Sequence, residues 1–246
     1  MELISYPNQL DQLLKVFLDI ENPAELKRME NTLAKVSLKN ENENERAEKF
    51  LETFDKTNDF EKQMSLLRIL GSTGDTRALK YIKASLKNEN EDVQKTAIQS
   101  LNNWPNIEPI YDLLDIVKTN KNSTLQILAL RGFINLVKAN GQNENAPVVD
   151  LYKTAMEYSK SDNEKIMIIS GIGDVQTLEA LNFTSPYLNN NSLRPEAEIA
   201  CINIISKVGW TNPEESLQVI ETILKNPTSS EIEKEASRIK NNILSK

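Results

Sequence analysis

The sequence predicts an all-α protein, an α-solenoid of about seven antiparallel helix pairs. Apolar residues recur at the three- and four-residue spacing of amphipathic helices, and only 7 of the 246 residues are glycine. A short apolar segment also recurs every 31 to 39 residues along the chain. Repeats of this length, each one helix pair, stack so that every pair buries its apolar face against its neighbours.

The repeat is clearest between Leu66 and Leu101. One apolar helix ends at the turn 71–75, a second is expected over 78–86, and a third follows the polar run 88–92. The third helix has the small apolar core Ala97–Leu101. Related cores occupy Leu33–Val36, Leu66–Leu70, Ala129–Phe133, Ile168–Ile172, Cys201–Ile205 and Ala236–Lys240.

We predict a single repeat domain over residues 1–246. Its seven pairs span about 8–39, 44–72, 76–103, 107–139, 146–174, 177–208 and 213–244. Most prolines fall near helix starts, where the missing N–H costs little, but Pro186 predicts a kink or break near 184–186. Side-chain N-caps are expected at Thr76, Ser123, Ser161, Thr211 and Ser229.

Composition restricts the function. The net charge of −7 and the pI near 5.0 provide no global basic field for nucleic acid or for an anionic membrane. Histidine is absent, which removes the commonest general base and zinc ligand, and the single Cys201 excludes an intramolecular disulfide and a cysteine-rich metal cluster. We therefore predict no enzyme activity, no cofactor and no metal site.

The sequence leaves the compartment open. No segment approaches the roughly 20 apolar residues of a membrane-spanning helix, and residues 1–7 lack the features of a signal peptide. A cytoplasmic location is expected if Met1 is the native start. A periplasmic or extracellular location is expected if the chain is a fragment of a secreted parent.

The segment from Leu66 to Leu101 resembles the HEAT repeat. Its pattern is Leu-Leu-x-x-Leu-Gly-x-x-Gly-Asp-x-Arg-Ala-Leu, followed by Leu-Lys-Asn-x-Asn-x-Asp-Val-x-x-x-Ala-x-x-x-Leu. Weaker copies extend the resemblance over nearly the whole chain. The resemblance implies a right-handed, armadillo-like superhelix in which the second helix of each pair lines a concave, partner-binding surface.

The chain departs from the HEAT pattern in its polar positions. Many HEAT repeats carry an Asp in the turn within a pair and an Arg just after a Val, and these build a ladder between repeats. Here the turns carry Asn88 and Asn120. The Arg positions are occupied by Gln94, Gln126, Lys165 and Glu198. The sequence therefore predicts at most an amide ladder.

A narrower resemblance appears downstream. The segments 129–137, 165–175, 177–181 and 186–188 are similar to HEAT segments of Bacteroidetes and planctomycete proteins. Such segments accompany a 3-keto-disaccharide hydrolase domain or a haem-binding domain. The resemblance implies a multi-domain, extracytoplasmic parent that acts on carbohydrate, but no hydrolase sequence is present here, so it assigns no catalytic residue.

One position of the recurring core is polar in all seven repeats while its neighbours are apolar. Its residues are Lys35, Arg68, Gln99, Arg131, Ser170, Asn203 and Arg238. They are either ordinary solvated helix surface or the mildly basic, amide-rich floor of a groove that binds an acidic or sugar-bearing partner. On the second interpretation, charge reversal at Arg68 and Arg131 should abolish binding without lowering the melting temperature.

Two tryptophans occupy comparable places, each just past the end of a second helix. Trp104 precedes Pro105, and Trp210 precedes Thr211. They either pack at the turn between pairs or form aromatic anchors on the rim of a binding surface.

These observations predict a non-catalytic protein-interaction or scaffolding module. Its expected partner is another protein or a neighbouring domain of the same parent chain, with no membrane contact and no predicted oligomeric state. One alternative is a helical accessory domain of a larger secreted carbohydrate-active protein. A DNA glycosylase built on HEAT-like repeats is disfavoured, because it needs a strongly basic channel and a catalytic carboxylate.

Overall fold

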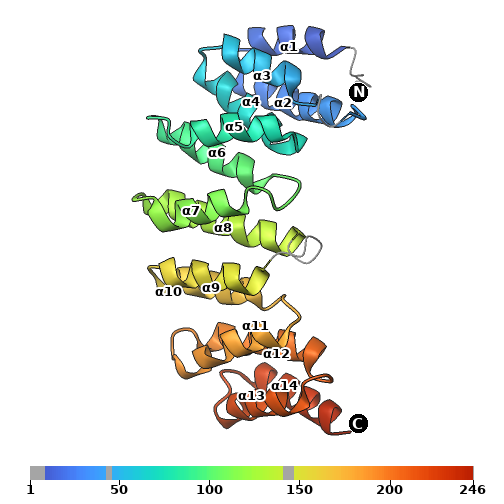
Figure 1. Cartoon of the computed structure of the whole chain (residues 1–246), viewed down its shortest axis with the longest axis vertical. Helices are drawn as coiled ribbons and strands as arrows, with labels where there is room; N and C mark the ends of the chain where they lie inside the picture. Colours follow the sequence, from blue (N-terminus) through green and yellow to red (C-terminus); the bar gives the residue numbers. More distant parts are fainter. Residues whose placement is uncertain (1–8, 43–45, 141–146, 246) are drawn as a thin grey trace. The chain divides into compact units, whose positions relative to one another are not determined.

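All regular structure in the described residues is helical. The computed structural model describes residues 9–42, 46–140 and 147–245, which contain fourteen α-helices, α1 to α14, and the 3-10 helix η3, without strands (Figure 1). The chain divides into two compact units, Met1–Asn140 (unit 1) and Gly141–Lys246 (unit 2). The predicted all-α fold of about seven helix pairs is therefore confirmed, whereas a single domain over 1–246 stays a prediction.

Unit 1 contains four helix pairs. They are α1 (Leu10–Asp19) with α2 (Pro23–Leu38), α3 (Glu48–Lys56) with α4 (Phe60–Thr73), α5 (Thr76–Ser85) with α6 (Glu91–Asn102), and α7 (Ile110–Thr119) with α8 (Ser123–Asn140). Each pair falls inside its predicted range to within a residue. The predicted starts at residues 8 and 44 lie outside the described residues.

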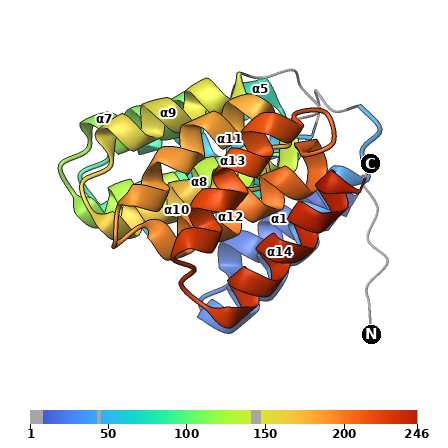
Figure 2. The same cartoon turned by 90° about the horizontal axis from the view of Figure 1, so that it is seen from below.

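Unit 2 contains three helix pairs. They are α9 (Val148–Tyr158) with α10 (Asp162–Ile172), α11 (Leu178–Thr184) and η3 (Ser185–Asn189) with α12 (Arg194–Val208), and α13 (Pro213–Lys225) with α14 (Ser230–Leu244). In Figure 2 the first helices of these pairs lie on one side of the unit and the second helices on the other. The predicted start at residue 146 lies outside the described residues. The break expected near Pro186 is confirmed, because α11 ends at Thr184 and η3 follows.

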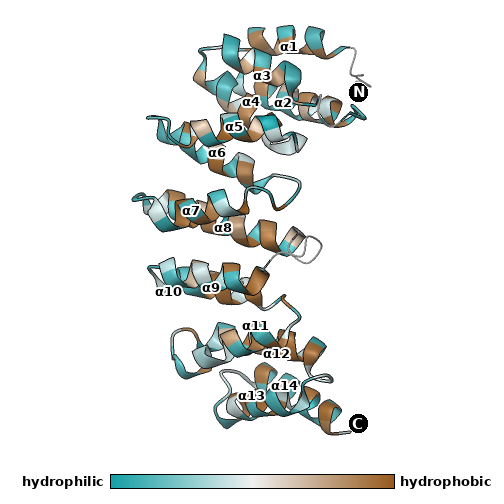
Figure 3. Ribbon diagram, viewed as in Figure 1, coloured by the Kyte–Doolittle hydropathy of each residue, from teal (hydrophilic) through white to brown (hydrophobic). Residues whose placement is uncertain are grey.

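The second helices pack directly on one another within each unit. In unit 1, α4 packs between α2 and α6, and α6 between α4 and α8; in unit 2, α12 packs between α10 and α14. A helix with neighbours on both sides needs apolar residues around most of its circumference. This is why the recurring core reads almost continuously apolar, with Leu33, Leu66, Ala97 and Ala129 fully buried. Figure 3 shows both hydrophobic and hydrophilic residues along each helix.

Small residues let neighbouring second helices approach closely. A Cβ atom placed on Gly71 of α4 would lie 2.6 Å from the backbone oxygen of Ser100 on α6. On α8, a Cβ on Gly132 would lie 1.5 Å from Oδ1 of Asn102. The packing of α4 against α6 and of α6 against α8 therefore requires glycine at these two positions.

The turn at Gly74 and Asp75 joins two pairs, and residues 71–73, predicted in this turn, belong to α4. Gly74 caps α4 with a positive φ of 71°, a left-handed conformation that favours glycine, and Asp75 caps α5 by accepting from the Arg77 amide at 2.9 Å. The predicted N-caps at Ser161 and Ser229 are confirmed. The predictions at Thr76, Ser123 and Thr211 are wrong by one residue. Asp75 and Asn122 bind the free amides instead, and Asn212 is the boundary residue of α13.

Exposed polar contacts join successive first helices. In unit 1, Lys49 pairs with Asp11 at 3.5 Å, the Tyr81 hydroxyl donates to Asp55 at 2.8 Å, and Lys83 pairs with Asp112 at 2.9 Å. In unit 2, Lys153 pairs with Glu179 at 2.6 Å. We call these contacts the first-helix links.

No helix in the described ranges is long and apolar enough to cross a membrane.

Candidate interaction surfaces

The structure places all seven residues of the predicted polar row on second helices. In unit 1, Lys35, Arg68, Gln99 and Arg131 lie on α2, α4, α6 and α8, which pack in that order; we call these four residues the second-helix row. In unit 2, Ser170, Asn203 and Arg238 lie on α10, α12 and α14. All seven are exposed except Arg68, which is half-buried.

Arg68 differs from the rest of the row because it holds a buried carboxylate. Its Nε atom and its Nη2 atom each lie 2.9 Å from Oε2 of Glu30 on α2, and Nη2 also donates to the Ser65 hydroxyl at 3.0 Å. Glu30 is only 4% exposed, and its other oxygen pairs with Lys27 at 2.5 Å. A charged contact therefore joins the first two helix pairs. The sequence did not predict this contact.

This contact corrects one expectation. Reversing the charge of Arg68 would set two carboxylates against each other at a buried site, so the substitution should lower stability. The expectation that reversal at Arg68 leaves the melting temperature unchanged is therefore dropped. Lys35 and Arg131 form no ion pair with any described residue and are the better probes.

The two tryptophans have different environments. Trp104 is 3% exposed and packs in the interior at the end of α6, so its interpretation as a rim anchor is dropped in favour of packing. Trp210 is 44% exposed and lies just past the end of α12. It lines a small pocket of about 80 Å³ between α12 and α14, together with Arg238, Ser206 and Asn242. The structure thus brings two of the predicted site residues, Trp210 and Arg238, into the same pocket.

Arg238 is not an isolated charge. Its guanidinium pairs with Glu235, one turn earlier on α14, at 2.5 Å. The hydrogen bonds of this contact, together with the opposite charges, raise the pKa of the guanidinium and lower the pKa of the carboxyl. The polar row of unit 2 is therefore locally neutralised at this position.

Sequence reasoning missed a buried ionic cluster in unit 2. Nε of Arg194 lies 2.8 Å from Oε1 of Glu198, one turn later on α12, and Glu198 is fully buried. The other carboxylate oxygen accepts from the amide and hydroxyl of Thr228, between α13 and α14. Arg194 also donates to the carbonyls of Leu188, Thr222, Ile223 and Asn226. The cluster joins η3, α12, α13 and the turn after it.

The predicted amide ladder has a different geometry. Nε2 of Gln94 donates to the carbonyl of Asn88 at 2.5 Å, and Nε2 of Gln126 donates to the carbonyl of Val117 at 2.8 Å. Both acceptors belong to the same helix pair as their donor. Gln126 therefore ties α8 to α7, and Gln94 ties α6 to the turn before it. Contacts between pairs are made by Glu30 with Arg68 and by Glu198 with Thr228.

One thiol and one phenol in the interior of unit 2 are held protonated. Burial, with a smaller contribution from the charge of Glu198, raises the pKa of the Cys201 thiol to about 12. Burial and the charge of Asp174 raise the pKa of the Tyr152 phenol. Neither group is a nucleophile at neutral pH in this environment. Across the described part of the chain, no three Cys, Asp or Glu side chains converge on a point where a metal could bind.

Comparison with known proteins identifies no family. No protein-family model and no curated protein matches the chain. Several solved structures are similar to it, including the following two. An engineered protein is 18% identical, with 97% of this chain and 69% of that chain covered and a TM-score of 0.45. Human deoxyhypusine hydroxylase in complex with glycerol is 12% identical, with 98% and 97% covered and a TM-score of 0.41. Structural similarity at these TM-scores and sequence identities does not indicate an activity for this chain.

Proposed function

We propose that the chain is a non-catalytic, HEAT-like interaction module that binds an acidic segment of a partner protein on the second helices of unit 1. The second-helix row carries the proposal. It sets the exposed cations Lys35 and Arg131, the amide Gln99 and the guanidinium of Arg68, which is paired with Glu30, on four successive, directly packed helices. A row of this kind provides repeated contacts at regular intervals to an extended partner.

Apart from Glu30, which pairs with Arg68, no acidic residue lies beside the row on its own helices. Positions three and four residues away lie on the same face of a helix. None of these positions around Lys35, Arg68, Gln99 or Arg131 carries an Asp or a Glu. They are Asn31, Thr32, Leu38, Lys39, Met64, Ser65, Gly71, Ser72, Lys95, Thr96, Asn102, Asn103, Ile127, Leu128, Ile134 and Asn135.

The basic row is a local feature of an acidic protein. Unit 1 has 19 Lys and Arg against 21 Asp and Glu, and unit 2 has 10 against 15, so both units have a net negative charge. Local basic patches on an otherwise acidic surface favour an acidic ligand at that patch and disfavour it elsewhere. This charge pattern supports a partner that binds unit 1 in a fixed register.

A defined acidic peptide tests the proposal. A fluorescent peptide of about twelve residues, alternating Glu and Ala, should bind the full chain with an affinity that falls as salt rises. The double variant K35E/R131E should weaken binding about tenfold or more, because two of the row's charges are reversed. Fluorescence anisotropy measures both effects, and a Gln-for-Glu peptide reports the contribution of charge.

The control is K80E/K121E, which makes the same change in net charge away from the row. Lys80 is exposed on α5 and Lys121 is exposed before α8. This control should bind within about twofold of wild type. Equal losses in the two variants, or unchanged binding by K35E/R131E, would contradict the proposal.

The pocket beside Trp210 favours a second candidate function, an accessory domain of a carbohydrate-active parent. An exposed indole stacks on the apolar face of a sugar, and Arg238, Ser206 and Asn242 offer hydrogen bonds around it. Titration with neutral oligosaccharides, followed by Trp fluorescence in wild type and W210A, separates this candidate from the first. Saturable quenching that W210A abolishes would support it, and the absence of quenching would oppose it.

A further inference from the structure

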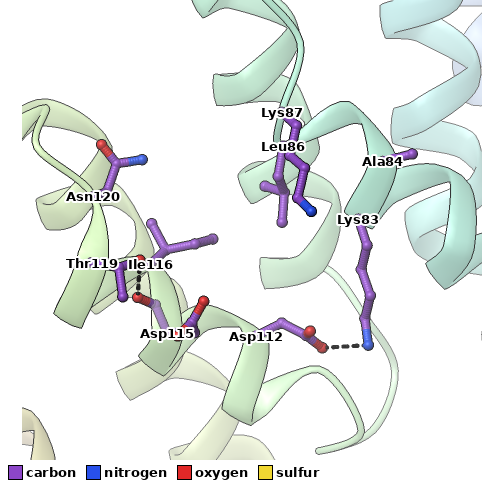
Figure 4. A pocket seen from close by; sticks show the side chains of 9 residues that line it. All are labelled: Lys83, Ala84, Leu86, Lys87, Asp112, Asp115, Ile116, Thr119 and Asn120. Atoms are coloured by element: carbon purple, nitrogen blue, oxygen red, sulfur yellow. Dashed lines mark hydrogen bonds and ion pairs between the residues drawn. The ribbon is translucent and has the colours of Figure 1, made fainter.

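A cleft lies between the first helices α5 and α7 of unit 1, and we call it the α5–α7 cleft. Its volume is about 640 Å³, within the 300–1,000 Å³ that is common for ligand sites. Figure 4 shows side chains from both helices lining it. Its lining residues are Lys83, Ala84, Leu86, Lys87, Asp112, Asp115, Ile116, Thr119 and Asn120.

The two walls of the cleft carry opposite charges. Lys83 and Lys87 stand on the α5 side, and Asp112 and Asp115 stand on α7. Lys83 and Asp112 neutralise each other across the cleft at 2.9 Å. Neither Lys87 nor Asp115 forms an ion pair with any residue that the structure describes. One cation and one anion therefore remain available on opposite walls.

Apolar surface lies between these charges. Leu86, Ala84 and Ile116 line the cleft, and Ile116 is 8% exposed. Thr119 and Asn120 add uncharged polar groups at the α7 end. A ligand that fits must combine an anionic group, a cationic group and aliphatic surface in one chain.

We propose that the α5–α7 cleft binds a short peptide segment of a partner protein that carries one basic and one acidic side chain. The basic side chain pairs with Asp115 and the acidic side chain with Lys87, while intervening aliphatic groups contact Leu86 and Ile116. A nucleic acid would bring phosphates against Asp112 and Asp115, and a neutral sugar would leave both free charges unpaired.

The cleft lies on the first helices, whereas the second-helix row lies on the second helices of the same unit. The two surfaces therefore belong to different layers, and the proposal does not depend on the acidic partner of the row. A protein with both sites can bind two segments at once, so the module would connect them.

The probe is a set of capped peptides in which Lys and Glu are separated by one, two or three Ala. Each peptide is titrated into the isotope-labelled full chain, and backbone amide shifts are recorded. At least one member should shift the amides of the cleft residues, and binding should weaken as salt rises. Peptides with Gln in place of Glu, or with norleucine in place of Lys, should bind about three- to fivefold more weakly.

Charge exchange provides the decisive variants. Asp115→Lys alone and Lys87→Glu alone each give the cleft two free charges of one sign, so each should reduce affinity about tenfold. The double variant K87E/D115K again offers opposite charges and should recover affinity to within about threefold. Lys80→Glu, on α5 but outside the lining, is the matched control for Lys87→Glu and should have no effect.

Several results would overturn the proposal. They are the absence of cleft shifts with every peptide at millimolar concentration, single variants that bind as wild type does, and a double variant that binds no better than the singles. Equal binding of a mixture of free lysine and glutamate would show that no peptide is required. The variant K35E/R131E should leave this binding unchanged, so failure of the row and failure of the cleft are distinguishable.

Discussion

The Oε2 atom of Glu30 lies 2.9 Å from both Nε and Nη2 of Arg68, and this contact joins α2 to α4. The Glu30 side chain is 6% exposed, whereas the Arg68 side chain is 28% exposed. A buried carboxylate loses its hydration and needs cationic partners to remain in place. Arg68 therefore has a structural role within the second-helix row.

Arg68→Glu should destabilise unit 1 by about 3–5 kcal/mol, because it leaves the buried carboxylate beside a second negative charge. Urea denaturation followed by circular dichroism measures the loss. The matched control Arg131→Glu makes the same charge change at an exposed position and should cost less than about 0.5 kcal/mol. The apolar double variant E30M/R68M should regain most of the stability, and a double variant as unstable as Arg68→Glu would argue against this account.

Glu198→Ala should destabilise unit 2 by about 3 kcal/mol, because Arg194 loses its ion pair and Thr228 loses its acceptor. Glu198→Gln should have a smaller effect, since its amide oxygen can still accept from Thr228. Glu196→Ala, on the same turn of α12, is the control and should be nearly neutral. Thermal unfolding measures all three, and equal losses for Glu196 and Glu198 would refute the prediction.

Substitution of the two tryptophans should lower the stability of the protein by different amounts. Trp104→Ala should cost about 3–5 kcal/mol, because a large side chain is removed from the interior. Trp210→Ala should cost much less, since its indole is 44% exposed. Denaturant midpoints measure the difference. A similar loss for both variants would show that Trp210 is also a packing residue.

Cys201 should make stability fall at alkaline pH. The folded protein holds the thiol proton up to a pKa of about 12, whereas an unfolded chain releases it near 9.0. Stability from this group is therefore complete below pH 9 and is lost as the pH rises from 9 to 12, by at most about 1.4 kcal/mol per pH unit. The difference between wild type and Cys201→Ala isolates the effect. Rapid labelling of the native thiol at pH 8 would contradict it.

The helix pairs could be predicted because their signals are local. Apolar spacing, polar turns and proline positions each depend on a few neighbouring residues, and they located every pair within the described residues. The caps were less certain, because Asp75 and Thr76 are adjacent and both can accept from a free amide. The polar row could also be predicted, since it follows from aligning the second helices.

The charged contacts and the tryptophan environments could not be predicted. Glu30 and Arg68 are separated by 38 residues, and only the packing of α2 on α4 brings them together. Trp104 and Trp210 follow similar helix ends, but the connection after Trp104 runs to Ile110 and the one after Trp210 only to Pro213. The tryptophan before the longer connection, Trp104, is the buried one. These outcomes depend on tertiary contacts that no local pattern encodes.

The first-helix links have a mechanical consequence for unit 1. They are exposed ion pairs and a hydroxyl contact, each worth at most about 1 kcal/mol and screened by salt. The second helices instead meet through close-packed cores, with Gly71 against Ser100, which resist separation. When unit 1 bends, the second helices should therefore stay in contact while the first helices move apart. Because Lys83–Asp112 spans the α5–α7 cleft, ionic strength would tune the stiffness of the wall that receives the peptide.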